Sequence, residues 1–83
     1  MPFTIIWPEP VLNQLRKLDR SIVKRIFEAI TRLEENPGRW VKRIVNSPYY
    51  SFRVGDYRII VDIQKEELIV LVVKVGHRKN VYD

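Results

Sequence analysis

The stretch that decides the fold is residues 50–63, YSFRVGDYRIIVDI. Apolar side chains alternate with polar ones on both sides of Gly55 and Asp56, which predicts two β-strands joined by a two-residue turn. With that turn, Arg53 faces Arg58 across the two strands, while the flanking apolar residues share the other face of the sheet. The sequence therefore predicts one apolar face, suited to packing, and one face that carries a pair of arginines.

Upstream of this hairpin the apolar spacing is helical. Leucines recur at about one helical turn over residues 9–18, and isoleucines do so over residues 19–33, which predicts two amphipathic helices. Asp19 is expected to cap the second helix, and Pro37-Gly38 is expected to open a turn after it. Residues 3–7 form a β-type run that prolines stop, which predicts a first strand.

Downstream of the hairpin, a charged turn leads into residues 68–75, a run that is apolar on both faces and therefore predicts a central strand. The prediction is one α+β domain over residues 1–83. It has an N-terminal strand, a helical hairpin, and then a three-stranded antiparallel meander, with the helices on one face of the sheet. Whether Lys74 shares the face of the arginines depends on the register of the last turn, which the sequence leaves open.

Composition excludes several kinds of site. The chain has no cysteine and a single histidine, which excludes disulfide frameworks, thiolate zinc sites and metal sites built on several imidazoles. Its carboxylates lie in turns or near strand ends, so neither a magnesium site nor a cofactor is expected. The longest apolar run is far shorter than the ~20 residues of a spanning helix, and the N-terminus lacks a basic signal region. We therefore expect a cytoplasmic protein without membrane contact.

Charge is distributed unevenly along the chain. Fifteen Lys and Arg against ten Asp and Glu give a formal net charge of +5. Residues 1–38 carry six basic and five acidic side chains, whereas residues 39–83 carry nine and five. A basic surface of this kind favours nucleic acid or an acidic protein as partner.

The arginine pair indicates which of these partners to expect. Like charges directly opposite in a sheet are destabilising, but an anion between them reverses the sign of the interaction. Guanidinium groups match phosphate geometry and stay charged at any working pH. The alternative is two solvated arginines that splay apart and cover the sheet with their stems. Lys42 and Arg43 before the hairpin, and Arg78 after the last strand, favour a phosphate-binding face.

Binding of single-stranded RNA also needs aromatic rings on which bases stack. Tyr82 lies in a polar tail without a core pattern, so it is the ring that we assign to function. Tyr49 fits either a core or a stacking role. Tyr50 has the parity of Phe52 and is expected in the core.

Residues 49–82, YYSFRVGDYRIIVDIQKEELIVLVVKVGHRKNVY, resemble the C-terminal half of toxins of the RelE/ParE superfamily. The helical hairpin and first strand match as well, so the similarity covers essentially the whole chain. The resemblance implies a toxin of a type II toxin–antitoxin pair. Members of the RelE branch are ribonucleases that cut the mRNA codon in the ribosomal A site and so inhibit translation. The ParE branch keeps the fold but poisons DNA gyrase.

The resemblance also assigns roles to residues. Arg58 matches the family arginine that contacts the scissile phosphate, and Arg78 matches a second catalytic arginine. Tyr82 matches the C-terminal tyrosine that stacks on or orients the substrate base, and Arg53 matches a basic strand position. Because the ParE branch usually lacks the full Arg/Arg/Tyr set, the RelE branch is favoured. The alternative is a ParE-like toxin that inhibits gyrase without cleaving RNA.

Two positions depart from the family pattern. Ser51 stands where a further basic residue is common, and His77 stands where some members have lysine. Imidazole exchanges a proton near neutral pH, so His77 is a candidate for proton transfer, the alternative being a residue that merely lines the groove. The expected enzyme is a metal-independent endoribonuclease whose partners are the ribosome, mRNA and a RelB-like antitoxin. Further expected RNA contacts are Lys42, Arg43, Lys79 and Tyr49.

Overall fold

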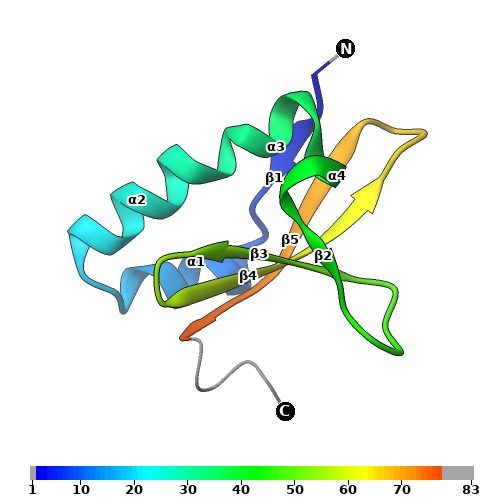
Figure 1. Cartoon of the computed structure of the whole chain (residues 1–83). Helices are drawn as coiled ribbons and strands as arrows, with labels where there is room; N and C mark the ends of the chain where they lie inside the picture. Colours follow the sequence, from blue (N-terminus) through cyan, green and yellow to red (C-terminus); the bar gives the residue numbers. More distant parts are fainter. Residues whose placement is uncertain (1, 78–83) are drawn as a thin grey trace.

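The structure is a computed structural model, and it describes residues 2–77. Five strands form one mixed sheet in the order β1-β5-β4-β3-β2 (Figure 1). Strand β1 runs parallel to β5, and every other neighbouring pair is antiparallel. The bounds of the strands are β1 (Thr4–Ile6), β2 (Lys42–Arg43), β3 (Tyr50–Val54), β4 (Tyr57–Gln64) and β5 (Ile69–His77). The predicted α+β class and antiparallel meander are confirmed.

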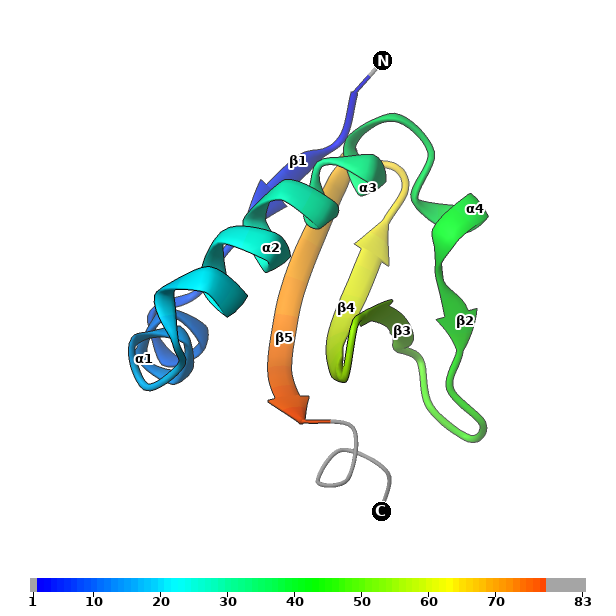
Figure 2. The same ribbon diagram turned by 60° about the vertical axis from the view of Figure 1, so that its left-hand side comes forward.

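The helical hairpin is confirmed as well. Helices α1 (Glu9–Arg16) and α2 (Arg20–Ile30) follow the first strand, and two single turns follow them, α3 (Arg32–Glu35) and α4 (Pro37–Trp40). Pro8 is the N-cap residue of α1 and a proline also lies in the first turn, where the missing N–H has no intrahelical partner to lose. Figure 2 shows α1 and α2 together on one side of the strands.

Three details differ from the sequence prediction. Asp19 is the N-cap residue of α2, but its side chain makes no capping hydrogen bond and accepts one from the hydroxyl of Ser21 at 3.4 Å. Pro37 and Gly38 form a helical turn, α4, and not an open turn. Strand β2 was not predicted, because its two residues are too few to show an alternating pattern and it exists only by pairing with β3.

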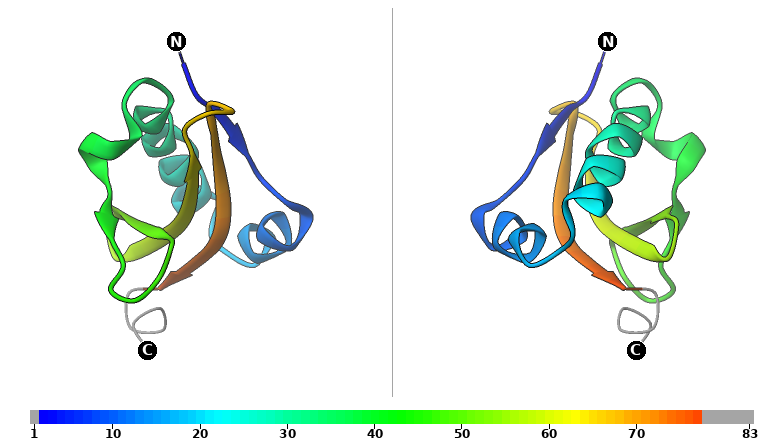
Figure 3. Two further views of the ribbon diagram at one scale, coloured as in Figure 1. Left: turned by 90° about the vertical axis from the view of Figure 1, so that its right-hand side faces the viewer. Right: turned by 90° about the vertical axis from the view of Figure 1, so that its left-hand side faces the viewer.

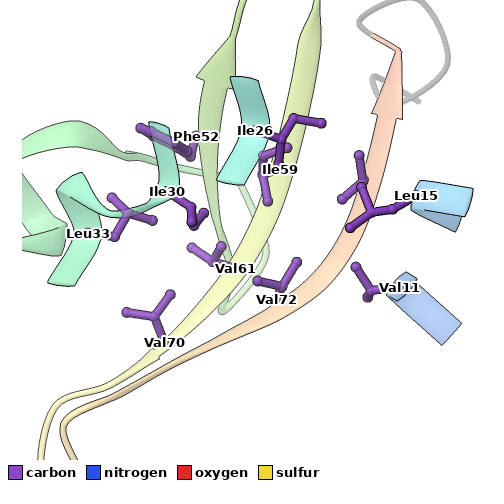
Figure 4. Close-up of a cluster of buried hydrophobic side chains, with 11 residues drawn as sticks. Val11, Leu15, Ile26, Ile30, Leu33, Phe52, Ile59, Val61, Val70 and Val72 are labelled. Carbon is purple, nitrogen blue, oxygen red and sulfur yellow. The ribbon is translucent and has the colours of Figure 1, made fainter. Parts of the chain in front are cut away.

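The apolar face of the meander packs against the helices, and this packing forms the core. Ile26, Ile30 and Leu33 point from the helices toward the sheet, as Figure 4 shows. They meet a layer of strand residues that are at most 5% exposed, namely Phe52, Ile59, Val61, Val70, Val72 and Val75. Val11 and Leu15 cover the same layer from α1. The hydrophobic effect thus determines which side chains of the sheet face the helices.

A β-bulge interrupts the pairing of β4 with β5. Val61 pairs with Val72, but Ile60 pairs with Lys74, so Val73 is an extra residue on β5. The bulge lets Val72 and Val75, three positions apart, both enter the core, whereas Val73 and Lys74 are exposed. It therefore decides the question that the sequence left open, because it places Lys74 on the face of the sheet opposite the helices.

No helix within residues 2–77 combines the length and the apolar character that crossing a membrane requires.

Candidate functional site

The candidate site is the face of the sheet turned away from α2, which the left panel of Figure 3 brings to the front. Strand alternation and the register of the pairings place four cations on this face: Lys42 on β2, Arg53 on β3, Arg58 on β4 and Lys74 on β5. We call this set the basic face. The four cations come from four different strands, and the segment from Lys42 to Lys74 spans 33 positions of the sequence.

The arginines form the row of the basic face nearest the hairpin turn. Arg53 pairs directly with Arg58, as the sequence predicts, and the next position on β5 is Gly76. Gly76 has no side chain, so no side chain of β5 stands directly opposite Arg58. Two cations therefore lie side by side, in an arrangement that is unfavourable unless an anion joins them.

Hydrogen bonds hold both arginines in place. Arg53 donates from Nε to the carbonyl oxygen of Gly55 at 3.2 Å. Arg58 donates from a terminal nitrogen to Oγ of Ser51 at 3.4 Å, and its side chain is partly buried. Such contacts restrict the rotamers of long side chains, so less entropy is lost when a ligand binds.

A second row lies two residues further from the turn. Ser51 pairs with Ile60, Lys42 pairs with Ser51, and Lys74 pairs with Ile60. The two inner side chains are small or apolar, and Ile60 is only 8% exposed. Lys42 and Lys74, both exposed, stand at the two ends of this row.

Three of these cations have no acidic partner within residues 2–77. Among the described residues, no carboxylate makes a salt bridge with Lys42, Arg53 or Lys74. Asp62 has the same parity as Arg58 on β4, but it lies beyond Ile60 and accepts a hydrogen bond from Gln64 at 3.1 Å. Within residues 2–77, Lys42, Arg53 and Lys74 therefore contribute a positive field on this face of the sheet.

Other predicted site residues lie elsewhere. Arg43 pairs with Tyr50, and its guanidinium stands 5.9 Å from the centre of that ring, away from the arginine pair. His77 pairs with Tyr57, and the two rings meet edge to face at 5.3 Å. Both residues thus have the parity of the helix-covered face. Tyr50 packs against the core as expected.

Tyr49 directly precedes β3 and is 36% exposed. Its backbone N–H donates to Oγ of Ser47, and its carbonyl accepts from the N–H of Ile44. It lies two positions before Ser51, just outside the strand. Arg78, Lys79 and Tyr82 lie outside the described residues.

Sequence reasoning could not place Lys74 on the basic face. Residues 68–75 are apolar on both sides, so either parity of β5 was possible, and a bulge leaves no local sequence signal in such a run. The only hint is the charge itself, since a lysine is rarely buried.

Comparison with known proteins identifies the family of the chain. Residues 5–82 match the model of the family described as the ParE toxin of the type II toxin–antitoxin system parDE. The chain belongs to this family. It is thus a type II toxin of the RelE/ParE superfamily. A search of curated protein sequences found no match.

Solved structures agree with this assignment. A chain of the toxin–antitoxin complex RelBE2 from Mycobacterium tuberculosis is 30% identical, with a TM-score of 0.83 over 94% of this chain and 100% of that chain. A chain of the archaeal RelE-RelB complex from Pyrococcus horikoshii is 22% identical, with a TM-score of 0.81 over 98% and 100%. The E. coli toxin RelE is 20% identical, with a TM-score of 0.79 over 98% and 88%. The last two similarities concern the fold alone.

Proposed function

We propose that this toxin is a ribosome-dependent, metal-independent endoribonuclease that cuts mRNA and thereby inhibits translation. The observation that carries the proposal is the cross-strand pair of Arg53 and Arg58 on the face of the sheet opposite α2. A phosphodiester between the two guanidinium groups would turn a repulsive pair into two attractive contacts. The scissile phosphate is the ligand that this geometry fits.

The reaction that suits such a site uses the nucleophile that RNA carries. The 2′-oxygen bonds to the adjacent phosphorus, the bond from phosphorus to the 5′-oxygen breaks, and the proton lost by the 2′-hydroxyl is balanced by one gained by the leaving oxygen. Negative charge builds on the non-bridging phosphate oxygens in the transition state. In this proposal Arg58 stabilises that charge, with Arg53 beside it and Arg78 as a second catalytic arginine.

The site offers fewer residues for proton transfer than for stabilising the charge on the phosphate. In the proposal Tyr82 stacks on or orients the base, and His77 is the candidate for proton transfer. His77 has the parity opposite to that of the arginines, so in-line orientation of the 2′-hydroxyl has to supply much of the rate. An enzyme of this kind needs its substrate held in place, which is the task of the ribosome here.

Primer extension on an mRNA under translation in vitro tests the proposal, with the same mRNA run without ribosomes. Wild-type toxin is expected to produce breaks only when ribosomes are present. Arg58→Ala should lower the cleavage rate by about 10²- to 10³-fold, because it removes a preorganised charge from the transition state. Arg58→Lys keeps the charge but loses the fork, so its rate should fall between the two. Lys65→Ala, in the exposed turn between β4 and β5, is the matched control and should cut normally.

The family match to ParE toxins favours one second candidate, inhibition of DNA gyrase without RNA cleavage. A supercoiling assay with purified gyrase separates the two functions. Intact mRNA together with inhibited supercoiling, unaffected by Arg58→Ala, would establish the gyrase reading and reject the ribonuclease. Normal supercoiling together with ribosome-dependent breaks would do the reverse.

We also propose a RelB-like antitoxin as partner, since the relatives from M. tuberculosis and P. horikoshii were solved as toxin–antitoxin complexes. A groove between α1 and α2 supports this proposal. It has a volume of about 690 Å³, and its charged lining residues are Arg16, Arg20, Lys24 and Glu28, which leaves a basic excess. An amphipathic, acidic segment would fit a groove of this chemistry. The apolar side chains that line it are Leu12, Leu15, Leu18, Val23 and Phe27.

A further inference from the structure

We propose that Lys74 binds the RNA phosphate that adjoins the one held between Arg53 and Arg58. The inference rests on the proposed function, because it takes single-stranded RNA as the ligand of the basic face. It adds a binding residue beside the arginine pair, one whose face of the sheet the sequence pattern left open.

The register sets the relation between Lys74 and the arginines. Lys74 pairs with Ile60, and Ile60 is two residues along β4 from Arg58, on the same face. Same-face positions on a strand are about 6.8 Å apart, and diagonal neighbours on adjacent strands are about 7–8 Å apart. That separation is comparable with the distance between successive phosphates of one nucleotide strand. A strand with one phosphate at the arginines would therefore bring the next one to Lys74.

The β-bulge is what turns Lys74 outward. If the pairing of Val61 with Val72 continued without interruption, Lys74 would stand opposite Ile59, which is fully buried under the helices. With Val73 as the extra residue, Lys74 stands opposite Ile60 and is exposed. A bulge breaks the ladder locally, and one of its common uses is to aim a side chain at a site.

The surroundings of Lys74 suit a phosphate. The two inner side chains of the row, Ser51 and Ile60, are small or apolar and carry no charge. No described carboxylate forms a salt bridge with Lys74. An ammonium group on a flexible stem binds phosphate as a point charge and does not need a fixed orientation. The backbone of an RNA strand, whose sequence varies, is a fitting ligand for such a group.

The test measures binding and not cleavage. A fluorescent 2′-O-methyl tetranucleotide lacks the attacking hydroxyl, so its anisotropy reports affinity alone over a series of NaCl concentrations. Lys74→Ala should bind about three- to fivefold more weakly than wild type, and its salt slope should be shallower by about 0.7, the value of one lost contact to a single strand. Lys65→Ala should match wild type in both. Thermal unfolding checks that each variant is folded.

A dinucleotide with a single phosphate sharpens the test. That phosphate occupies the arginine pair, so Lys74→Ala should not change dinucleotide affinity, whereas Arg58→Ala should lower it. An unchanged affinity and slope for the tetranucleotide would overturn the inference, and so would an equal loss for both ligands. Weaker binding of the antitoxin with RNA binding unchanged would overturn it too and assign Lys74 to a protein interface.

The binding test separates this inference from the proposed function. If wild type leaves translated mRNA intact while Lys74→Ala still weakens tetranucleotide binding, the ribonuclease proposal fails and the phosphate contact stands. If Arg58→Ala abolishes cleavage while Lys74→Ala binds as wild type, the inference about Lys74 alone fails.

Discussion

The two faces of the sheet are built from the same strands, yet they have opposite effects on the stability of the fold. On the helix side, Ile59 and Val72 are fully buried in an apolar layer, where every side chain adds to stability. On the other side, Arg53 and Arg58 stand opposite each other, an arrangement that costs stability. The comparison teaches that the first face holds the fold together, whereas the second carries a pair of like charges whose repulsion a bound anion would offset.

Adjacent valines on β5 provide the sharpest way to break this comparison. Val72 is fully buried under the helices, whereas Val73, the extra residue of the bulge, is 36% exposed. Val72→Ala should lower the free energy of unfolding by roughly 2–3 kcal/mol, from the lost burial and the cavity left behind. Val73→Ala removes the same atoms from the same strand and should cost less than about 1 kcal/mol. Urea denaturation followed by circular dichroism measures both.

The valine pair also tests the bulge. Equal losses in the two variants would mean that Val73 is packed as tightly as Val72, which would contradict the register at Ile60 and Lys74.

The hairpin turn joins β3 to β4, and its glycine offers the next test. Gly55 has φ of +58°, and a Cβ atom there would lie 3.1 Å from a guanidinium nitrogen of Arg25. Gly55→Ala should therefore lower the free energy of unfolding by about 1–2 kcal/mol. It should also reduce RNA binding, because the Gly55 carbonyl holds Arg53.

Gly38→Ala is the matched control for the turn. A Cβ atom at Gly38 would meet nothing within 4 Å, so this variant should be as stable as wild type or slightly more stable. A similar loss in the two alanine variants, by thermal unfolding, would show that the turn geometry is not the cause.

The smallest expected effect concerns the arginine pair itself. Arg53→Ala removes one of two like charges, so stability should stay the same or rise by a few tenths of a kcal/mol, and the gain should shrink at high salt. RNA affinity should fall at the same time. A loss of stability above about 1 kcal/mol would mean that Arg53 serves the fold, as the solvated-arginine alternative holds. Paired urea curves at low and high NaCl decide this point.

Much of this molecule could be predicted from short-range patterns. The two-residue turn at Gly55-Asp56 fixed the pairing of Arg53 with Arg58, because the side-chain period of a strand is two and the turn length sets the register. The helical hairpin followed from its apolar stripe, although the capping role of Asp19 did not hold. Of the predicted site residues, Lys42 lies on the face of the two arginines, whereas Arg43 and His77 have the other parity.

What the sequence determined by itself is therefore the class of the fold, the hairpin and the arginine pair, since each follows from a side-chain pattern within a short segment of the chain. The tertiary structure alone decided the rest. Strand β2 exists only through its pairing with β3, and Lys74 reaches the basic face only through the bulge in β5. The physical reason is that a strand apolar on both sides has no preferred parity of its own, so its register is set by the packing of Val72 and Val75 under the helices.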